Sequence, residues 1–145
     1  MRRILPATLT IGMLACGGSS SSSAPQSPYN GTYDTTVTLL SENCTPDPTV
    51  QNASTVVAQN GTSPSVSLTH SGTTYAGTVN ASGDFTVPST MVSAGTVDIT
   101  GHFTGSAFNA TVNVQQTNPA CTYSVSWAGT KTSTTYPGDP YTGTY

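Results

Sequence analysis

Residues 96–115 read TVDITGHFTGSAFNATVNVQ, and this stretch carries the clearest structural signal in the chain. On both sides of Thr104-Gly105-Ser106, apolar and polar side chains alternate one by one. Such alternation is typical of a β-strand with one buried and one solvated face, and glycine between two alternating runs indicates a turn. The stretch therefore predicts an antiparallel hairpin whose apolar face covers a core.

Further alternating segments follow one another at short, regular intervals. Turn-forming pairs separate several of them, at Asn60-Gly61, Ser71-Gly72 and Ser82-Gly83. With the two strands of the hairpin they predict eight strands and no helix, the other six being residues 31–41, 54–59, 65–70, 73–80, 84–88 and 121–132. Sequential antiparallel strands of this number form an up-and-down barrel or a β-sandwich. We expect an all-β domain over residues 29–132, folded as a single antiparallel up-and-down β-barrel, with a β-sandwich as the alternative.

The positions that share the inward parity of these strands define the predicted interior. They are aliphatic and aromatic: Tyr33, Val37, Leu39, Val66, Leu68, Tyr75, Val79, Phe85, Val87, Val97, Ile99, Phe103, Phe108, Val112, Val114, Tyr123, Val125 and Trp127. An eight-stranded barrel is just wide enough to be filled by side chains or to hold one small ligand. The aromatic residues favour a packed core over a cavity. Gly77, Gly101 and Gly129 share the inward parity and would relieve crowding where the barrel bends.

The composition excludes nucleic-acid binding. Of 145 residues only three are Lys or Arg, so the chain cannot form the basic surface that contacts phosphates. Charged residues make up 6% of the chain, and 28 Thr and 19 Ser supply most of its polarity. An outward face of Thr, Ser, Asn and Gln can hydrogen-bond many partners weakly, glycans included.

The first residues have the features of a secretory signal peptide. Arg2 and Arg3 precede a mostly apolar run over residues 4–15, which is too short to span a bilayer. We therefore expect residues 1–15 to be a signal peptide. Its removal leaves Lys131 as the sole Lys or Arg beside six acidic residues, so the mature domain cannot bind anionic headgroups through its own charge.

Met13-Leu14-Ala15-Cys16 resembles the lipidation signal of a bacterial lipoprotein precursor. The resemblance implies that Cys16 becomes the first residue of the mature chain and carries a lipid such as palmitate. Residues 16–28 then form the lipidated cysteine and a flexible Gly/Ser/Pro tether. Gly17 and Gly18 lack the acidic signal for inner-membrane retention, so the resemblance implies a bacterial cell-envelope domain anchored by lipid to the outer membrane, facing the periplasm or the surface. The alternative is an ordinary cleaved signal peptide, with Cys16 as an accidental thiol.

The two remaining cysteines, Cys44 and Cys121, are expected to form a disulfide, because an export signal places them in an oxidising compartment. A metal or redox pair lacks supporting residues, since there is no C-x-x-C and few histidines. In a closed meander the first strand pairs with the last, so the end of one lies beside the start of the other. Cys44 follows the first predicted strand and Cys121 opens the last. Their disulfide would pin the seam that closes the barrel.

A second resemblance links the first and last strands. Gly31-Thr32-Tyr33 and the segment from Trp127 to Lys131 are similar to motifs of lipocalin-like barrels, which place a Gly-x-aromatic motif early and a basic residue late. The resemblance implies that Lys131 packs over the Tyr33 ring, in a barrel-closing cluster that includes Trp127. The alternative is that Lys131 is a solvated edge residue.

No catalytic or metal-binding constellation stands out. A serine nucleophile or a metal site would need His70 or His102. His70 lies at a predicted hairpin turn and His102 on outward parity, so we expect both to face solvent. Asp34, Asp84 and Asp98 also fall on outward parity, where no burial would raise the pKa of a catalytic carboxyl. We therefore predict no catalytic residue, no metal and no cofactor.

These features favour a non-enzymatic, lipid-anchored β-barrel domain of the cell envelope that is structural or binds a ligand weakly. A lipocalin-like carrier of a small apolar ligand is the main alternative, and a hydrolase is a second one. The expected partners are the membrane, through the N-terminal lipid only, and a small apolar molecule or a glycan. Nucleic acid is not among them.

Residues 28–33 read PYNGTY, and residues 140–145 repeat this segment as PYTGTY. Self-similarity at a long period is typical of tandem domains. We expect residues 133–145 to be a C-terminal linker that leads into a second repeat of a longer protein. The alternative is a coincidence in a chain rich in Gly, Thr and Tyr.

Overall fold

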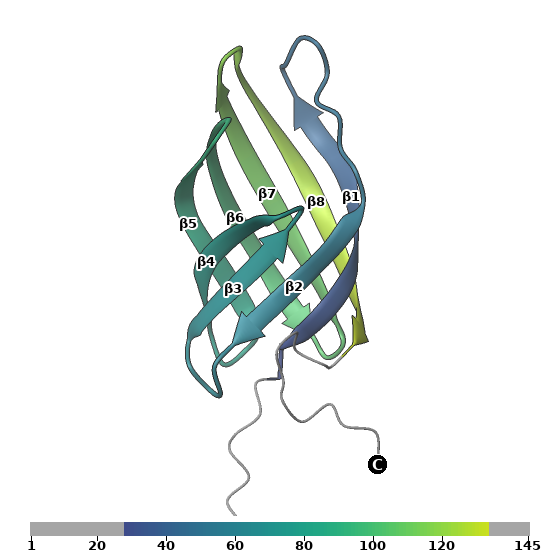
Figure 1. Cartoon of the computed structure of the whole chain (residues 1–145), viewed down its shortest axis with the longest axis vertical. Helices are drawn as coiled ribbons and strands as arrows, with labels where there is room; N and C mark the ends of the chain where they lie inside the picture. The colour runs from purple at the N-terminus through teal and green to yellow at the C-terminus, as the bar shows by residue number, and fades with distance from the viewer. Residues whose placement is uncertain (1–27, 134–145) are drawn as a thin grey trace, which may run out of the picture.

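The structure is a computed structural model that describes residues 28–133. Its eight strands form one closed antiparallel barrel in sequence order (Figure 1). The strands are β1 (Gly31–Glu42), β2 (Ala53–Gln59), β3 (Ser65–His70), β4 (Thr73–Val79), β5 (Asp84–Val92), β6 (Gly95–Thr104), β7 (Ala107–Thr117) and β8 (Ala120–Ser133). The predicted up-and-down barrel is confirmed, and the β-sandwich is set aside.

Residues 28–133 contain no helix, and thus none long and apolar enough to cross a membrane. The predicted signal peptide, Cys16 and its tether as far as residue 27 lie outside the described residues. So does the repeat predicted at the C-terminal end, from residue 134 onward.

The fifth strand is longer than predicted. The prediction placed its end at Pro88, and proline has no backbone N–H to donate to the sheet. Instead the pairing of β5 with β6 shifts register between Val87 and Thr90 and then continues to Val92. Pro88 thus lies within the irregularity, where the missing donor does not interrupt the ladder.

One end of the barrel interior is packed with aromatic rings. Tyr29 stacks on Phe103 with 4.4 Å between ring centroids, and Phe85 lies 4.6 Å from Phe103. Phe108 meets Tyr33 edge to face at 5.2 Å. Because these rings contact one another, we call this region the packed end.

Three inward glycines relieve crowding in the barrel interior, as predicted. A Cβ at Gly129 would overlap the ring of Phe108, and a Cβ at Gly101 would come 2.5 Å from the ring of Phe85. A Cβ at Gly77 would collide with the carbonyl oxygen of Thr86 on the neighbouring strand. The aromatic rings and the glycines therefore occupy complementary positions in the core.

The first and last described residues lie together at the packed end (Figure 1). The Lys131 amino group near the end of β8 donates a hydrogen bond to the carbonyl oxygen of Pro28 at 3.0 Å. The chain therefore enters and leaves the barrel at the same end, and the opposite end is formed only by loops.

The wall of the barrel has unequal height. β2, β3 and β4 have six or seven residues each, whereas β1, β7 and β8 have 12, 11 and 14. In Figure 1 the β3–β4 hairpin ends well below the tips of β7, β8 and β1. The end of the barrel opposite the packed end is therefore lower on one side.

Candidate functional site: a cavity in the mouth of the barrel

A cavity of about 370 Å³ occupies the half of the barrel away from the packed end. Its walls include the inward valines of four strands, and part of its rim comes from the β1–β2 loop at residues 49–51. We call it the mouth cavity. Its lining includes the side chains of Val37, His70, Tyr75, Val97, Val112, Val114, Tyr123, Val125 and Trp127.

Sequence reasoning favoured a packed interior, and this expectation is wrong for the mouth half of the barrel. The Phe rings are all inward at the packed end, whereas the walls of the mouth are lined mainly by the smaller side chains of valine.

His70 and Trp127 separate the mouth cavity from the packed end. Their rings stack with 4.2 Å between centroids and 28° between planes. Tyr75 meets the indole ring edge to face, with centroids 6.1 Å apart. Aromatic contacts of this kind add stability beyond the area that they bury, so the bottom of the cavity is built from mutually supported rings.

The prediction that His70 faces solvent is wrong: only 8% of its surface is exposed. The turn begins one residue later, at Ser71, which adopts a positive φ of 48°. His70 instead keeps the inward parity of Val66 and Leu68 on β3. Alternation along the strand therefore determines its direction, and closeness to the turn does not.

Two buried threonines hold the His70 ring in place. The hydroxyl of Thr55 on β2 lies 2.9 Å from His70 Nδ1 and 2.7 Å from the hydroxyl of Thr35 on β1. Thr35 also donates to the carbonyl oxygen of Tyr33 at 3.3 Å. Thr55 is fully buried and Thr35 nearly so. A polar chain thus runs from β1 through β2 to the ring that lines the cavity.

Sequence reasoning missed the inward residues of the second strand. Val56 and Val57 are adjacent, so the apolar pattern of residues 54–59 does not say which parity is buried. The structure buries Thr55, Val57 and Gln59. Only pairing with neighbouring strands, such as Thr55 opposite His70, resolves this choice.

The mouth cavity is electrically neutral. No Asp, Glu, Lys or Arg is among the residues that line it. Burial lowers the pKa of the His70 imidazole below its ordinary value of 6.5, so the ring is neutral at pH 7. Burial also raises the pKa of Tyr75, which therefore keeps its phenolic proton at that pH.

The predicted disulfide is confirmed and lies at the mouth. The Cα atoms of Cys44 and Cys121 are 5.1 Å apart, within the range that a disulfide spans. Beside it, Asn43 and Thr122 exchange two hydrogen bonds: the Asn43 amide donates to the Thr122 carbonyl oxygen at 3.0 Å, and the Thr122 amide donates to Asn43 Oδ1 at 2.8 Å. The start of the β1–β2 loop is therefore fastened to β8, and the same loop supplies part of the rim.

In the predicted barrel-closing cluster, Lys131 contacts Tyr33, but Trp127 has other partners. Lys131 Nζ lies 5.3 Å from the centre of the Tyr33 ring, as the lipocalin-like motifs implied. Burial raises the pKa of Tyr33 to about 12, with a further increase from nearby Tyr29, so the ring under the ammonium group is neutral. Trp127 is not part of this contact, because its ring interactions are with His70 and Tyr75.

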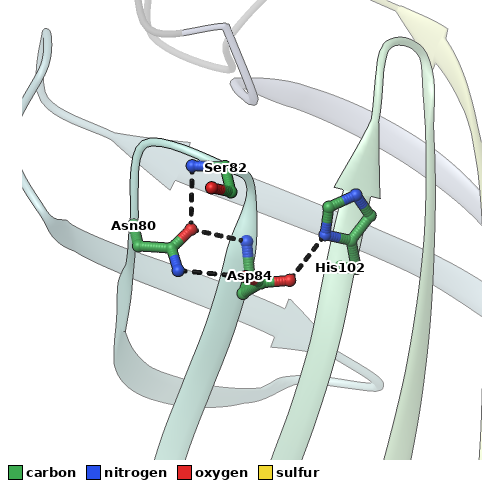
Figure 2. Close-up of polar contacts among 4 residues, drawn as sticks. All are labelled: Asn80, Ser82, Asp84 and His102. Atoms are coloured by element: carbon green, nitrogen blue, oxygen red, sulfur yellow. Dashed lines mark hydrogen bonds and ion pairs between the residues drawn. The ribbon is translucent and has the colours of Figure 1, made fainter.

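A second polar cluster lies outside the barrel at the packed end. The Asp84 carboxylate lies 2.7 Å from His102 Nδ1, while Asn80 Nδ2 donates to its other oxygen at 3.0 Å (Figure 2). Asn80 Oδ1 accepts hydrogen bonds from the amides of Ser82 and Asp84, both at 2.9 Å. Asn80 in the first place, and His102 in the second, hold the pKa of Asp84 below its ordinary value. His102 faces solvent as predicted, and the cluster fastens the β4–β5 turn.

The other acidic residues give no further site. Asp34 is exposed, and Asp98 accepts a hydrogen bond from Asn113 at 2.9 Å on the outer face. Within residues 28–133, no three His, Cys, Asp or Glu side chains are grouped so that they could hold a metal ion.

A larger hollow, about 550 Å³, lies on the outer face of β2, β3 and β4. It arises because Ala58, Ser67 and Ala76 are small side chains on neighbouring strands. It contains no titratable side chain and is bounded by the sheet on one side only. The mouth cavity is the better candidate, since strands surround it and it has a positioned polar group.

A comparison of the chain with protein-family models, with curated proteins and with solved structures finds no match in any of the three.

Proposed function

We propose that this protein is a non-enzymatic, lipid-anchored β-barrel domain of the bacterial cell envelope that binds one small, mainly apolar ligand in its mouth cavity. The observation that carries the proposal is the cavity itself, which lies inside the barrel and is lined by valines and by the stacked His70–Trp127 pair. Its volume of about 370 Å³ is within the range of small-molecule sites.

The division of the interior supports a binding role over a purely structural one. A barrel that served only as a rigid body would gain stability from a filled core, because cavities in a core are destabilising. Here aromatic rings pack together at one end, while the other holds a cavity whose rim includes part of a loop that a disulfide fastens to β8. The same arrangement would suit a lipocalin-like carrier.

The positions of the chain ends support the anchor. Pro28 and Lys131 meet at the packed end. A lipid at Cys16, joined through the tether of residues 17–28, would hold the barrel by that end. The mouth would then face away from the membrane and remain open to ligands.

The fluorescence of Trp127 provides the test, because it is the single tryptophan of the chain and it lines the cavity. We expect toluene or camphor to change its emission in a saturable manner. Val114→Phe, on an inward wall position, should abolish the change. The matched variant Gln115→Phe places the same side chain on the outer face and should retain it.

An emission that does not change for any small apolar compound, together with no transfer of NMR saturation from protein to compound, would overturn the binding role. The domain would then be structural.

A further inference from the structure

Among the side chains that line the mouth cavity, His70 is a buried hydrogen-bonding group. Its contacts with Thr55 and Trp127 fix the orientation of its ring. The other polar lining side chains, such as Thr49 and Ser93, are exposed at the rim, and Tyr75 is partly exposed. A ligand that enters the cavity and leaves water behind must therefore satisfy His70, or bury it without a partner at a cost.

The hydrogen bonds of the two threonines favour one tautomer of His70. A hydroxyl group has one proton to donate. With the Thr35 proton directed to the Tyr33 carbonyl oxygen, the proton between the two threonines belongs to Thr55. In this arrangement Thr55 has only a lone pair to offer to His70, which places the proton between them on His70 Nδ1.

A neutral imidazole that is protonated at Nδ1 has an unprotonated Nε2, which is an acceptor. His70 Nε2 makes no hydrogen bond to any residue between 28 and 133. Nε2 is not fully buried, and the His70 ring lines the cavity, so the atom is accessible from it. The cavity thus offers a lone pair at its bottom, surrounded by apolar walls.

We propose that the ligand is a compact neutral molecule with an apolar body and one hydroxyl or N–H group that donates a hydrogen bond to His70 Nε2. This inference rests on the proposed function and narrows it to a chemical class. Thr55 acts as a positioning residue, since it holds the tautomer without lining the cavity.

The same geometry makes binding sensitive to pH. The titratable groups that line the cavity around His70 are Tyr75 on β4 and Tyr123 on β8, and burial raises the pKa of Tyr75. Protonation of His70 would convert Nε2 from an acceptor into a donor. Ligands with a donor group would then lose their partner, so their affinity should fall in acid while that of purely apolar ligands changes less.

The test compares p-cresol with p-xylene by calorimetry at pH 7.5, because the two molecules have nearly the same shape and differ only in a hydroxyl that replaces a methyl group. We measure the ratio of the p-cresol affinity to the p-xylene affinity. This ratio should be about fivefold to tenfold higher for the unaltered protein than for His70→Phe, because the variant keeps an aromatic ring but has no hydrogen-bond acceptor. His102→Phe replaces the exposed histidine outside the cavity and should leave the ratio unchanged.

The outcomes separate this inference from the proposed function. If both compounds bind and His70→Phe does not change their ratio, the donor requirement is overturned while the cavity remains a binding site. If neither compound binds, both proposals fall.

A second measurement does not depend on any ligand. The ¹⁵N chemical shifts of His70 at pH 7.5 should show Nδ1 protonated and Nε2 unprotonated. Thr55→Val keeps the shape of the side chain but removes the hydroxyl, so it should allow the other tautomer and reduce the preference for p-cresol. A protonated Nε2 in the unaltered protein would contradict the proposal.

Discussion

The imidazole ring of His70 stacks on the indole ring of Trp127 and joins β3 to β8 across the barrel interior, with 4.2 Å between the ring centroids. This contact divides the barrel into two halves with different roles. The packed end supplies stability and receives both ends of the described chain, and the mouth supplies a neutral cavity.

Stability should depend on pH through His70. Burial lowers the pKa of this ring in the folded state, whereas the unfolded chain has the ordinary value of about 6.5. Between these two values the unfolded state binds more protons, so the free energy of unfolding should rise with pH and become constant above about 6.5. Urea unfolding from pH 4.5 to 8 measures this, and His70→Phe should have a shallower slope. An equal slope in the two proteins would show that His70 is not buried.

Loss of the disulfide should destabilise the barrel strongly. Cys44 and Cys121 are 77 residues apart, and a crosslink over so long a loop restricts the unfolded chain. We expect the double variant Cys44→Ser/Cys121→Ser to unfold with a free energy about 2–5 kcal/mol lower than that of the oxidised protein. Reduction of the unaltered protein serves as the control and should give a similar loss. A change of less than about 1 kcal/mol would mean that the seam between β1 and β8 does not need the bond.

Gly129→Ala should destabilise the packed end. The added methyl group would overlap the Phe108 ring, which other aromatic rings hold in place. Overpacking of this kind costs about 1–3 kcal/mol. Thr130→Ala, an exposed position one residue further along β8, is the matched control and should change stability by less than about 0.5 kcal/mol. Thermal unfolding followed by circular dichroism compares the two, and equal melting temperatures would contradict the packing described here.

Lipidation should depend on Cys16. If the chain is a lipoprotein, mass spectrometry of the protein from bacterial membranes will show a mature chain that starts at Cys16 and carries a diacylglyceryl group. Cys16→Ser should release the domain from the membrane fraction. A native chain with an unmodified N-terminus at another residue would remove the anchor from this account and leave the barrel and its cavity unchanged.

Most of the fold could be predicted from the sequence because strand direction is local information. Alternation places Phe103 and Val97 on one face and His102 on the other without reference to other strands. The cysteines then add one long-range contact, Cys44 to Cys121, and this contact distinguishes a closed meander from a sandwich.

The site was less predictable because its contacts join strands that are distant in the sequence. His70, Thr55 and Trp127 come from β3, β2 and β8, and no local pattern brings them together. The position of each aromatic ring along the barrel axis depends on strand tilt and register. The count of aromatic residues therefore suggested a filled interior, although the rings of Phe85, Phe103 and Phe108 all lie at one end.

Chemical-shift mapping of the ¹⁵N,¹³C-labelled protein with p-cresol shows directly whether a small ligand binds in the mouth. We expect saturable shifts at His70, Trp127 and Val112, which line the cavity, and none at Phe85 or Phe103 in the packed end. Shifts confined to the outer hollow around Ala58 and Ala76, or no shifts at the highest soluble concentration, would contradict this expectation.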